Sequence, residues 1–190
     1  MKRIGCIVGL ALMLGLTGSA AAGVLETVAF EFRGNQYHYR FSAHLAAPAA
    51  AVRAVVSDVN QLARTNDSIR ASRVLARHAD GSWLRQLKLR QCVLVFCFDI
   101  NLVERVSERA NGDIHTSVIP GAGNFRSGET VWQIIALPDG STQMVMEADQ
   151  EPDFWIPPVL GPLILKHTFT SEVQETLMKI EQLANAAAVR

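Results

Sequence analysis

The segment from Trp83 to Val106 alternates apolar and polar residues almost symmetrically about its centre. If it folds as a hairpin with Cys92 opposite Cys97, then Arg85 lies opposite Glu104. Successive side chains of a strand point to opposite faces of the sheet, so one face of this hairpin is apolar and the other is polar. The apolar face carries Trp83, Leu87, Leu89, Phe98, Ile100, Leu102 and Val106. The pattern therefore predicts a long antiparallel hairpin with one buried face, and it places the charged pair Arg85–Glu104 on that face.

The same alternation predicts strands on both sides of this hairpin. One strand runs from Thr27 to Arg33, and after a turn at Gly34-Asn35 a second continues from Tyr37 to Leu45. Pro48 then precedes apolar residues with helical spacing, which predicts a short helix. Its apolar positions are Val52, Val55, Val56, Val59 and Leu62. From Ile69 to Pro152 the pattern predicts only strands and turns.

Turn residues set two further strand pairings. Asn111-Gly112 favours a tight hairpin that places Glu108 opposite His115. Pro138-Asp139-Gly140 closes another hairpin, whose cross-strand pairs put four apolar residues on one face. These pairs are Ile134 with Met144 and Trp132 with Met146.

After Pro158 an apolar stripe predicts one long C-terminal helix. The stripe consists of Leu160, Leu163, Ile164, His167, Phe169, Val173, Leu177, Ile180 and Ala184. A sheet with one apolar face must bury it, and this helix is long enough to cover it. The sequence therefore predicts an α+β fold: a curved antiparallel sheet of about six to seven strands wrapped around the long C-terminal helix. A short helix follows the first strands, and a cavity lies between sheet and helix.

The first residues have the order of a secretory signal peptide. Lys2 and Arg3 precede an apolar run from Ile4 to Leu16, and small residues follow. The run is shorter than the roughly 20 residues that a membrane span needs. We expect residues 1–22 to be a signal peptide cleaved near Ala22 and residues 23–190 to form a single domain in the periplasm or outside the cell.

The charge balance argues against nucleic-acid binding, and the cysteine content predicts a disulfide. Cleavage would leave 16 basic and 18 acidic residues, and this balance gives no electrostatic footprint for nucleic acid. Cys92 and Cys97 would then be the remaining cysteines. In an exported protein two cysteines that face each other across a hairpin predict a disulfide, and a redox or metal site is the alternative.

Motifs for catalysis or metal binding are weak in this chain. No G-x-S-x-G or S-x-x-K motif is present, and Gly121-Ala122-Gly123 precedes a strand, so it predicts a turn and not a dinucleotide site. His38 and His44 share a strand face but are about 20 Å apart, too far to ligate one ion directly. We expect no metal and no cofactor.

Two segments resemble a known superfamily. The strand from Tyr39 to Pro48 and the helix from Val52 to Asp58 are similar to the opening of the START-like (SRPBCC, helix-grip) superfamily, in which a strand ends in Ala-Pro and the helix carries an aspartate before a loop. The segment from Pro157 to Pro162 resembles the coenzyme-Q-binding and polyketide-cyclase branch. The resemblance covers about residues 36–185. It implies an internal hydrophobic pocket that binds lipids, quinones, sterols or polyketides, and no catalytic motif of its enzymes matches here.

The predicted ligand-binding residues are those that face the cavity. They are Trp83, Arg85, Leu87, Leu89, Ile100, Leu102, Glu104, Trp132, Ile134, Met144, Met146, Phe169 and Val173. Arg85 and Glu104 are either a polar lining for a ligand headgroup or a structural ion pair. The apolar segments 93–96 and 154–156 are either an interaction or membrane surface or a lid folded over the cavity.

These features favour an exported protein that binds or transfers a hydrophobic ligand such as a lipid, an isoprenoid or a quinone-like molecule, with transient membrane contact. The alternative is a cyclase-like or hydrolytic enzyme that uses Glu104 or His167 as a general base in the same cavity. His167 is otherwise a hydrogen-bonded core residue. A third hypothesis is a protein-interaction module. The sequence names neither the ligand nor an oligomeric state.

Overall fold

The computed structural model describes residues 23–156 and 162–188, in which eight strands form one antiparallel sheet. The strands are β1 (Val24–Arg33), β2 (Gln36–Leu45), β3 (Ile69–Arg77), β4 (Trp83–Val93), β5 (Phe96–Glu108), β6 (Ile114–Val118), β7 (Phe125–Ala136) and β8 (Thr142–Pro152). The helices are α1 (Ala49–Ser57), the 3-10 helix η1 (Val59–Arg64) and α2 (Pro162–Ala188). The strand order is β1-β2-β8-β7-β6-β5-β4-β3, which leaves β1 and β3 at the two edges.

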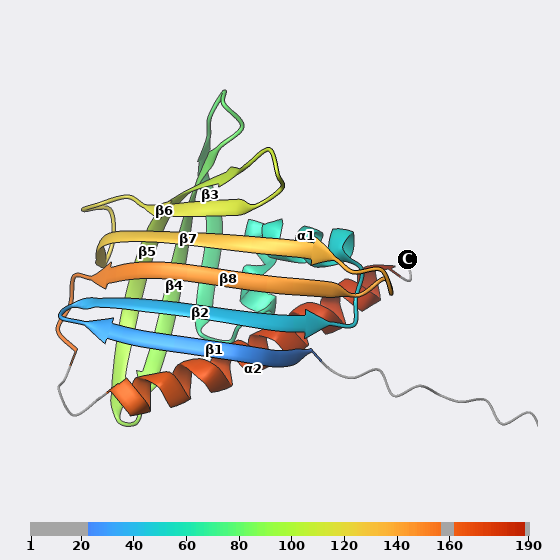
Figure 1. Cartoon of the computed structure of the whole chain (residues 1–190). Helices are drawn as coiled ribbons and strands as arrows, with labels where there is room; N and C mark the ends of the chain where they lie inside the picture. Colours follow the sequence, from blue (N-terminus) through green and yellow to red (C-terminus); the bar gives the residue numbers. More distant parts are fainter. Residues whose placement is uncertain (1–22, 157–161, 189–190) are drawn as a thin grey trace, which may run out of the picture.

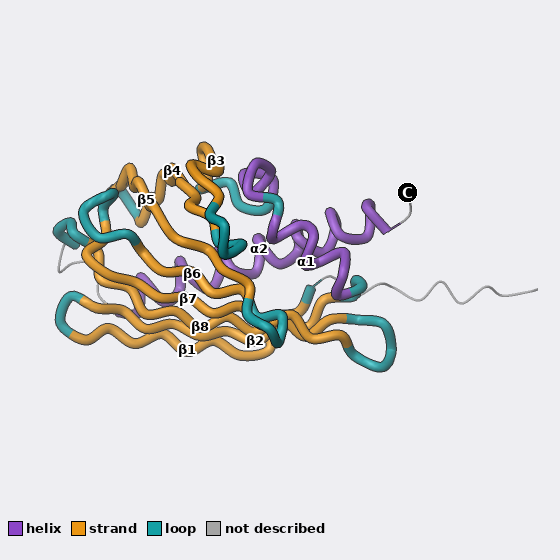
Figure 2. Tube along the Cα trace, turned by 90° about the horizontal axis from the view of Figure 1, so that it is seen from above, coloured by secondary structure: helices purple, strands orange, loops and turns teal. Residues whose placement is uncertain are grey.

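The sheet curves around α2, as the two views at right angles show (Figures 1 and 2). This arrangement confirms the predicted helix-grip fold. The sheet has eight strands where the sequence predicted six to seven. The difference arises because β2 pairs with β8 from Tyr37 to Leu45, so the whole first hairpin joins the sheet formed by the later strands.

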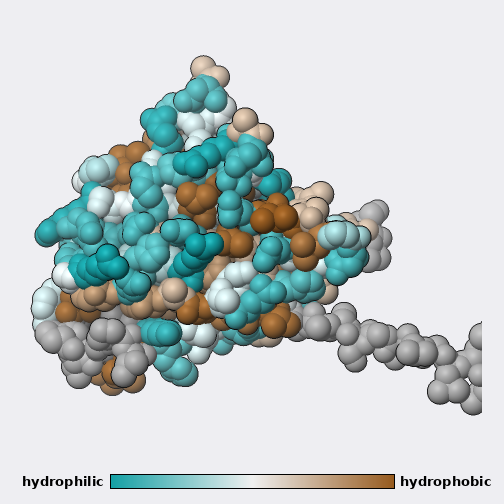
Figure 3. Space-filling view, in the orientation of Figure 1, coloured by the Kyte–Doolittle hydropathy of each residue, from teal (hydrophilic) through white to brown (hydrophobic). Residues whose placement is uncertain are grey.

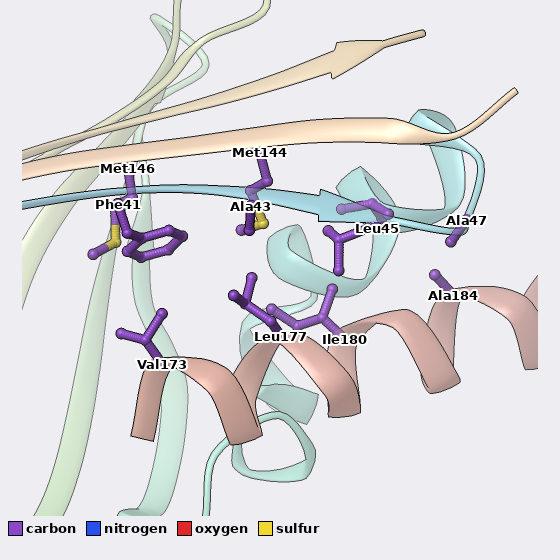
Figure 4. Packing of buried hydrophobic residues seen from close by; sticks show 11 residues of the cluster. Phe41, Ala43, Leu45, Ala47, Met144, Met146, Val173, Leu177, Ile180 and Ala184 are labelled. Carbon is purple, nitrogen blue, oxygen red and sulfur yellow. The ribbon is translucent and has the colours of Figure 1, made fainter. Parts of the chain in front are cut away.

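The main core lies between α2 and the strands β2 and β8 (Figure 4). On the strands it contains Phe41, Ala43, Leu45, Met144 and Met146, and on the helix Val173, Leu177, Ile180 and Ala184. The helix residues recur every three or four positions, so they share one face. This part of the predicted C-terminal stripe is confirmed.

The central hairpin has the predicted register. In the β4–β5 pair Arg85 lies opposite Glu104 and Cys92 lies opposite Cys97, and the two cysteines form a disulfide. The β7–β8 hairpin also has its predicted pairs, with Ile134 opposite Met144. Both hairpins therefore have the inward and outward faces that alternation predicts.

The predicted pairing of β5 with β6 is wrong by one residue. Glu108 lies opposite Ile114, not His115. The connecting turn uses the three residues 110–112, because the Arg109 N–H donates to the Asp113 carbonyl and Gly112 has a φ of 84°. Such a loop is a type I turn followed by a left-handed residue. The prediction of Glu108 opposite His115 required a two-residue turn instead. A slip of one residue turns every β6 side chain to the other face, so Ile114 and Thr116 point inward.

The helix predicted after Pro48 is interrupted. α1 ends at Ser57, and Asp58 has backbone angles of −79° and 84°, outside the helical region. Val59 and Leu62 continue in η1, where both are buried. Aspartate favours helix ends over helix interiors because its side chain competes for backbone hydrogen bonds.

The predicted signal peptide, residues 1–22, lies outside the described residues, as do Leu160 and the Pro157-Pro158 pair. Among the helices that the structure describes, none combines the length and the apolar composition needed to cross a bilayer.

Candidate functional site

A cavity of about 250 Å³ lies between the sheet and α2. Ten of the thirteen predicted ligand-binding residues line it: Arg85, Leu87, Leu89, Leu102, Glu104, Trp132, Met144, Met146, Phe169 and Val173. They come from β4, β5, β7, β8 and α2, so five elements distant in sequence enclose one space. Their role in binding stays a prediction, but the structure brings them together as the alternation required.

The other three predicted residues lie outside the cavity wall. Ile100 packs beside the cluster around Leu102, and Ile134 packs against the main core. Trp83 stands at the far end of the hairpin, where the Arg77 guanidinium lies 5.9 Å from the centre of its ring. Each has the correct inward orientation, but the cavity does not extend along the full length of the strands.

Arg85 and Glu104 form a buried ion pair in the cavity wall. Arg85 donates from Nε to a Glu104 carboxylate oxygen at 2.8 Å, and the two side chains are 12% and 3% exposed. The Thr116 hydroxyl donates to the other carboxylate oxygen at 3.1 Å. Two hydrogen bonds therefore compensate the carboxylate for its removal from water, as buried charges require.

Two tyrosines of β2 extend this polar region. The Tyr37 hydroxyl donates to Gln150 at 2.8 Å, and the Tyr39 ring packs 4.5 Å from the ring of Phe169 on α2. Burial raises the pKa of Tyr39, and the nearby negative charge of Glu104 raises it further. Tyr39 therefore remains a neutral hydroxyl at physiological pH.

Several cavity residues were not among the predicted ligand-binding residues. They include Tyr39, Phe41, Ile114, Thr130, Gln150 and Glu172. Tyr39 and Phe41 alternate with the polar Arg40 and Ser42, so the period of the strand could have placed both on the inward face. Ile114 was assigned to the wrong face by the β6 slip. Thr130 and Gln150 could have been found by continuing the alternation of β7 and β8 through polar residues.

Polar contacts fix α2 against the neighbouring elements of the cavity wall. Glu172 accepts hydrogen bonds from Gln91 on β4 and, at 3.5 Å, from the Ser68 hydroxyl. One helical turn later, Thr176 accepts a hydrogen bond of 3.0 Å from Asn66. These contacts join the helix to β4 and to the segment before β3.

Replacing Glu172 with Gln tests the cost of burying this carboxyl group. Partial burial raises the pKa of Glu172 above 4.5, against the lowering effect of its hydrogen bonds. The folded state therefore disfavours the charged form, so this group lowers stability above its folded pKa and has no effect below 4.5. We expect Glu172→Gln to melt at the same temperature as the wild type or a few degrees higher at pH 7. The difference should vanish as the pH falls to about 4.

Melting curves recorded by circular dichroism at a series of pH values measure this effect. Asp58→Asn, at an exposed position between α1 and η1, controls for the loss of one negative charge away from Glu172. A Glu172→Gln variant that is less stable at every pH would show that the hydrogen bonds outweigh the desolvation.

The β4–β5 turn exposes two apolar side chains. Leu94 and Val95 form the turn and are 69% and 87% exposed, whereas Val93 is buried. Leu94 has a φ of 55°, a left-handed conformation that costs a residue with a Cβ about 1–2 kcal/mol. The Cys92–Cys97 disulfide joins the strands directly beneath this turn.

The linker after β8 also has one aromatic residue that packs inward and one that faces solvent. Phe154 packs against Phe98 and Phe125, with ring centres at 5.5 and 6.1 Å. Trp155 is 72% exposed. Some residues of these apolar segments therefore pack inward while Leu94, Val95 and Trp155 face solvent, and both alternatives stay predictions.

The histidines lie away from the cavity. His38 contacts Asp149 at 2.9 Å and His44 contacts Ser141 at 2.8 Å, both on the outer face. His167 is exposed, which contradicts its predicted place on the apolar stripe. It lies two positions before Phe169, which is about 200° around a helix. Within the described part of the chain no three potential metal-ligating side chains gather.

Comparisons with known proteins agree with this geometry. A family model described as polyketide cyclase/dehydrase and lipid transport matches residues 36–185, and the chain belongs to this family. Its fold is START-like. No curated protein matches the chain.

Similar solved structures show the same fold at low identity. A START superfamily protein from Mycobacterium smegmatis is 22% identical with a TM-score of 0.62, covering 79% of this chain and 98% of that one. The Zhui aromatase/cyclase from Streptomyces sp. R1128 is 17% identical with a TM-score of 0.57, covering 82% and 94%. A STAR-related lipid transfer protein from Xanthomonas axonopodis is 14% identical with a TM-score of 0.57, covering 82% and 99%.

Proposed function

We propose that this protein binds a lipid, isoprenoid or quinone-like molecule in the cavity between the sheet and α2, and transfers it outside the cytoplasm. The observation that carries the proposal is the cavity itself, whose wall is mostly apolar. Its membership of a family that includes lipid transport supports the same function. The signal-peptide pattern of residues 1–22 and the Cys92–Cys97 disulfide favour a periplasmic or secreted location.

Burial of apolar ligand surface supplies the binding energy in this proposal. A ligand that buries about 300 Å² of apolar surface gains about 7 kcal/mol at 25 cal/mol per Å². The Arg85 guanidinium carries N–H groups that the bond to Glu104 does not use. These groups would donate to a carbonyl or hydroxyl oxygen of the ligand and fix its orientation.

Native mass spectrometry of the purified protein, before and after organic extraction, tests the function. A bound, extractable hydrophobic molecule supports binding or transfer. A protein without one, which also fails to bind added lipids, contradicts the proposal.

An enzyme in the same cavity has less support. A general base must reach the ligand, and His167 is exposed on α2. Glu104 reaches the cavity, but Arg85 and Thr116 occupy its carboxylate. Turnover of an ester or polyketide substrate that is lost in a Glu104→Gln variant would favour the enzyme.

The exposed apolar turn fits transient contact with a membrane. Leu94 and Val95 project from the end of the β4–β5 hairpin, near the start of α2 (Figure 1), and this turn holds Leu94 in a left-handed conformation. Figure 3 shows a face that is hydrophilic over much of its area, with apolar residues in its centre and along its lower edge. An apolar turn at the end of a hairpin, in a conformation that favours glycine or asparagine, is expected to serve a function.

Polar substitutions in this turn and at Trp155 should slow lipid transfer without weakening binding. We expect the triple variant Leu94→Asn, Val95→Ser, Trp155→Ser to exchange a fluorescent lipid between vesicles severalfold more slowly, because the contact with the bilayer is lost. Its equilibrium binding and melting temperature should stay close to wild type. Leu75→Ser, at an exposed apolar position on β3, is the control. Unchanged exchange would place the membrane contact elsewhere.

A further inference from the structure

A second hollow of about 250 Å³ adjoins the cavity. It lies between β4, the segment before β3 and the middle of α2. Thr65, Asn66, Glu172 and Thr176 line both spaces, so the two are neighbours that share one wall. We call the second hollow the polar groove, because most of its other residues are charged.

The polar groove exists because β3 is shorter than β4 at this end. The pairing of the two strands begins with Ile69 opposite Leu89, and the Arg90 N–H donates to the Ser68 carbonyl. β4 continues to Val93 without a strand beside it on that edge. α2 crosses the gap and is joined to β4 by the hydrogen bond from Gln91 to Glu172.

Cationic and anionic groups are balanced in the polar groove. Its cations are Arg70, Arg90 and Lys179, and its acids are Asp67, Glu172 and Glu175. Lys179 pairs with Asp67 at 2.7 Å, and Arg90 makes a longer, exposed contact of 3.4 Å with Asp99 outside the groove. Arg70 takes part in no ion pair within the described residues. Two exposed arginines therefore border the groove on the side of β3 and β4, and two carboxyl groups border it on the side of α2.

We infer that the polar groove binds the zwitterionic, phosphate-bearing headgroup of an amphiphile whose hydrocarbon part occupies the cavity. This inference rests on the proposed function and names the chemistry of the ligand. Arg70 and Arg90 would bind the phosphate, since guanidinium groups donate paired hydrogen bonds to phosphate oxygens. Glu172 and Glu175 would face the ammonium group.

The size of the cavity supports separate positions for the hydrocarbon part and the headgroup of the ligand. Its 250 Å³ lies below the 300–1,000 Å³ that is usual for a pocket enclosing a whole small molecule. A chain of hydrocarbon fits the apolar wall, while a charged headgroup in the same space would lose its hydration. The adjoining groove is open to water and supplies both signs of charge.

The position of the groove also agrees with membrane contact at the β4–β5 turn. Arg90 lies four residues from Leu94 along the strand, or about 13 Å at 3.3 Å per residue. When the turn enters a bilayer, Arg90 therefore lies near the depth of the lipid headgroups. A lipid could then move from the bilayer to the groove with its headgroup in a polar environment throughout.

The experiment compares two lipids that differ only in the headgroup, dioctanoylphosphatidylcholine and dioctanoylglycerol, each at monomeric concentration. The delipidated wild-type protein should bind the phosphatidylcholine more tightly. The double variant Arg70→Gln, Arg90→Gln should bind it about tenfold more weakly, the equivalent of one charge-assisted contact. Its affinity for dioctanoylglycerol should not change. Both arginines are exposed, so the variant should fold normally.

Arg73→Gln is the matched control, because Arg73 is an exposed arginine of β3 that does not line the groove. The inference is wrong if the wild-type protein binds both lipids equally, or if the double variant binds phosphatidylcholine like the wild type. It is also wrong if glycerophosphocholine alone binds as tightly as the lipid, since the groove would then be a site for a soluble phosphate compound. If neither lipid binds, the proposed function itself fails.

Discussion

Replacing Glu104 with Leu should lower the free energy of unfolding by about 3–5 kcal/mol, because the buried charge of Arg85 loses its partner. The pair is almost completely removed from water, with side-chain exposures of 12% and 3%. At roughly 2–4 °C per kcal/mol for a chain of this size, the melting temperature should fall by about 10 °C. Thermal and urea unfolding of the single variant measure the effect.

A double variant distinguishes the cost of an unpaired charge from the value of the pair. Arg85→Met combined with Glu104→Leu removes both charges, and we expect it to recover most of the lost stability, since apolar residues often replace a buried pair at little cost. Arg40→Met breaks an exposed contact of 3.6 Å with Glu147 and should cost at most about 1 kcal/mol. A Glu104→Leu variant as stable as this control would show that water reaches Arg85.

The same double variant addresses the two alternatives for the pair. If Arg85 orients a ligand oxygen, the double variant should keep its stability and lose part of its ligand affinity. If the pair is only structural, affinity should be retained along with stability. Stability and binding measured on one protein therefore separate the two roles.

The alternation of apolar and polar residues predicted those parts of the fold that depend only on neighbouring residues, namely which side chains of a hairpin point inward. The inward face of the β4–β5 hairpin follows from the pairing of Cys92 with Cys97, and the facing of Trp132 and Met146 follows from the next turn. Each required only the period of a strand and a recognisable turn. Eight cavity residues on strands could be named from the sequence for this reason, and the helical stripe of α2 added Phe169 and Val173.

The parts that could not be predicted depend on geometry that alternation does not contain. Asn111-Gly112 is compatible with a turn of two or three residues, and that choice decides whether Thr116 reaches Glu104. The polar groove combines residues from the segment between η1 and β3, from the start of β3, from β4 and from α2, which meet only because β3 begins late. In the sequence, Arg70 and Arg90 read as ordinary solvent-exposed positions of two strands.

Replacing Leu102 with Trp should weaken ligand binding roughly thirtyfold or more while the protein remains folded. Leu102 is buried in the cavity wall on β5, so the larger ring would extend into space that the ligand needs. Loss of about 80 Å² of buried apolar ligand surface costs about 2 kcal/mol, which is about thirtyfold in affinity. The melting temperature of the ligand-free protein should be unchanged or higher, because the ring fills an existing cavity and creates no new one.

The same substitution on the opposite face of the sheet provides the control. Ile135 is an exposed residue of β7 next to the inward-facing Ile134, so Ile135→Trp adds an equal ring outside the cavity. Titration of both variants with one fluorescent lipid, together with their melting curves, gives affinity and stability for each. Because Ile135→Trp adds its ring outside the cavity, equal affinities of the two variants would contradict the cavity as the binding site. Selective loss in Leu102→Trp would place the ligand against the inner face of β5.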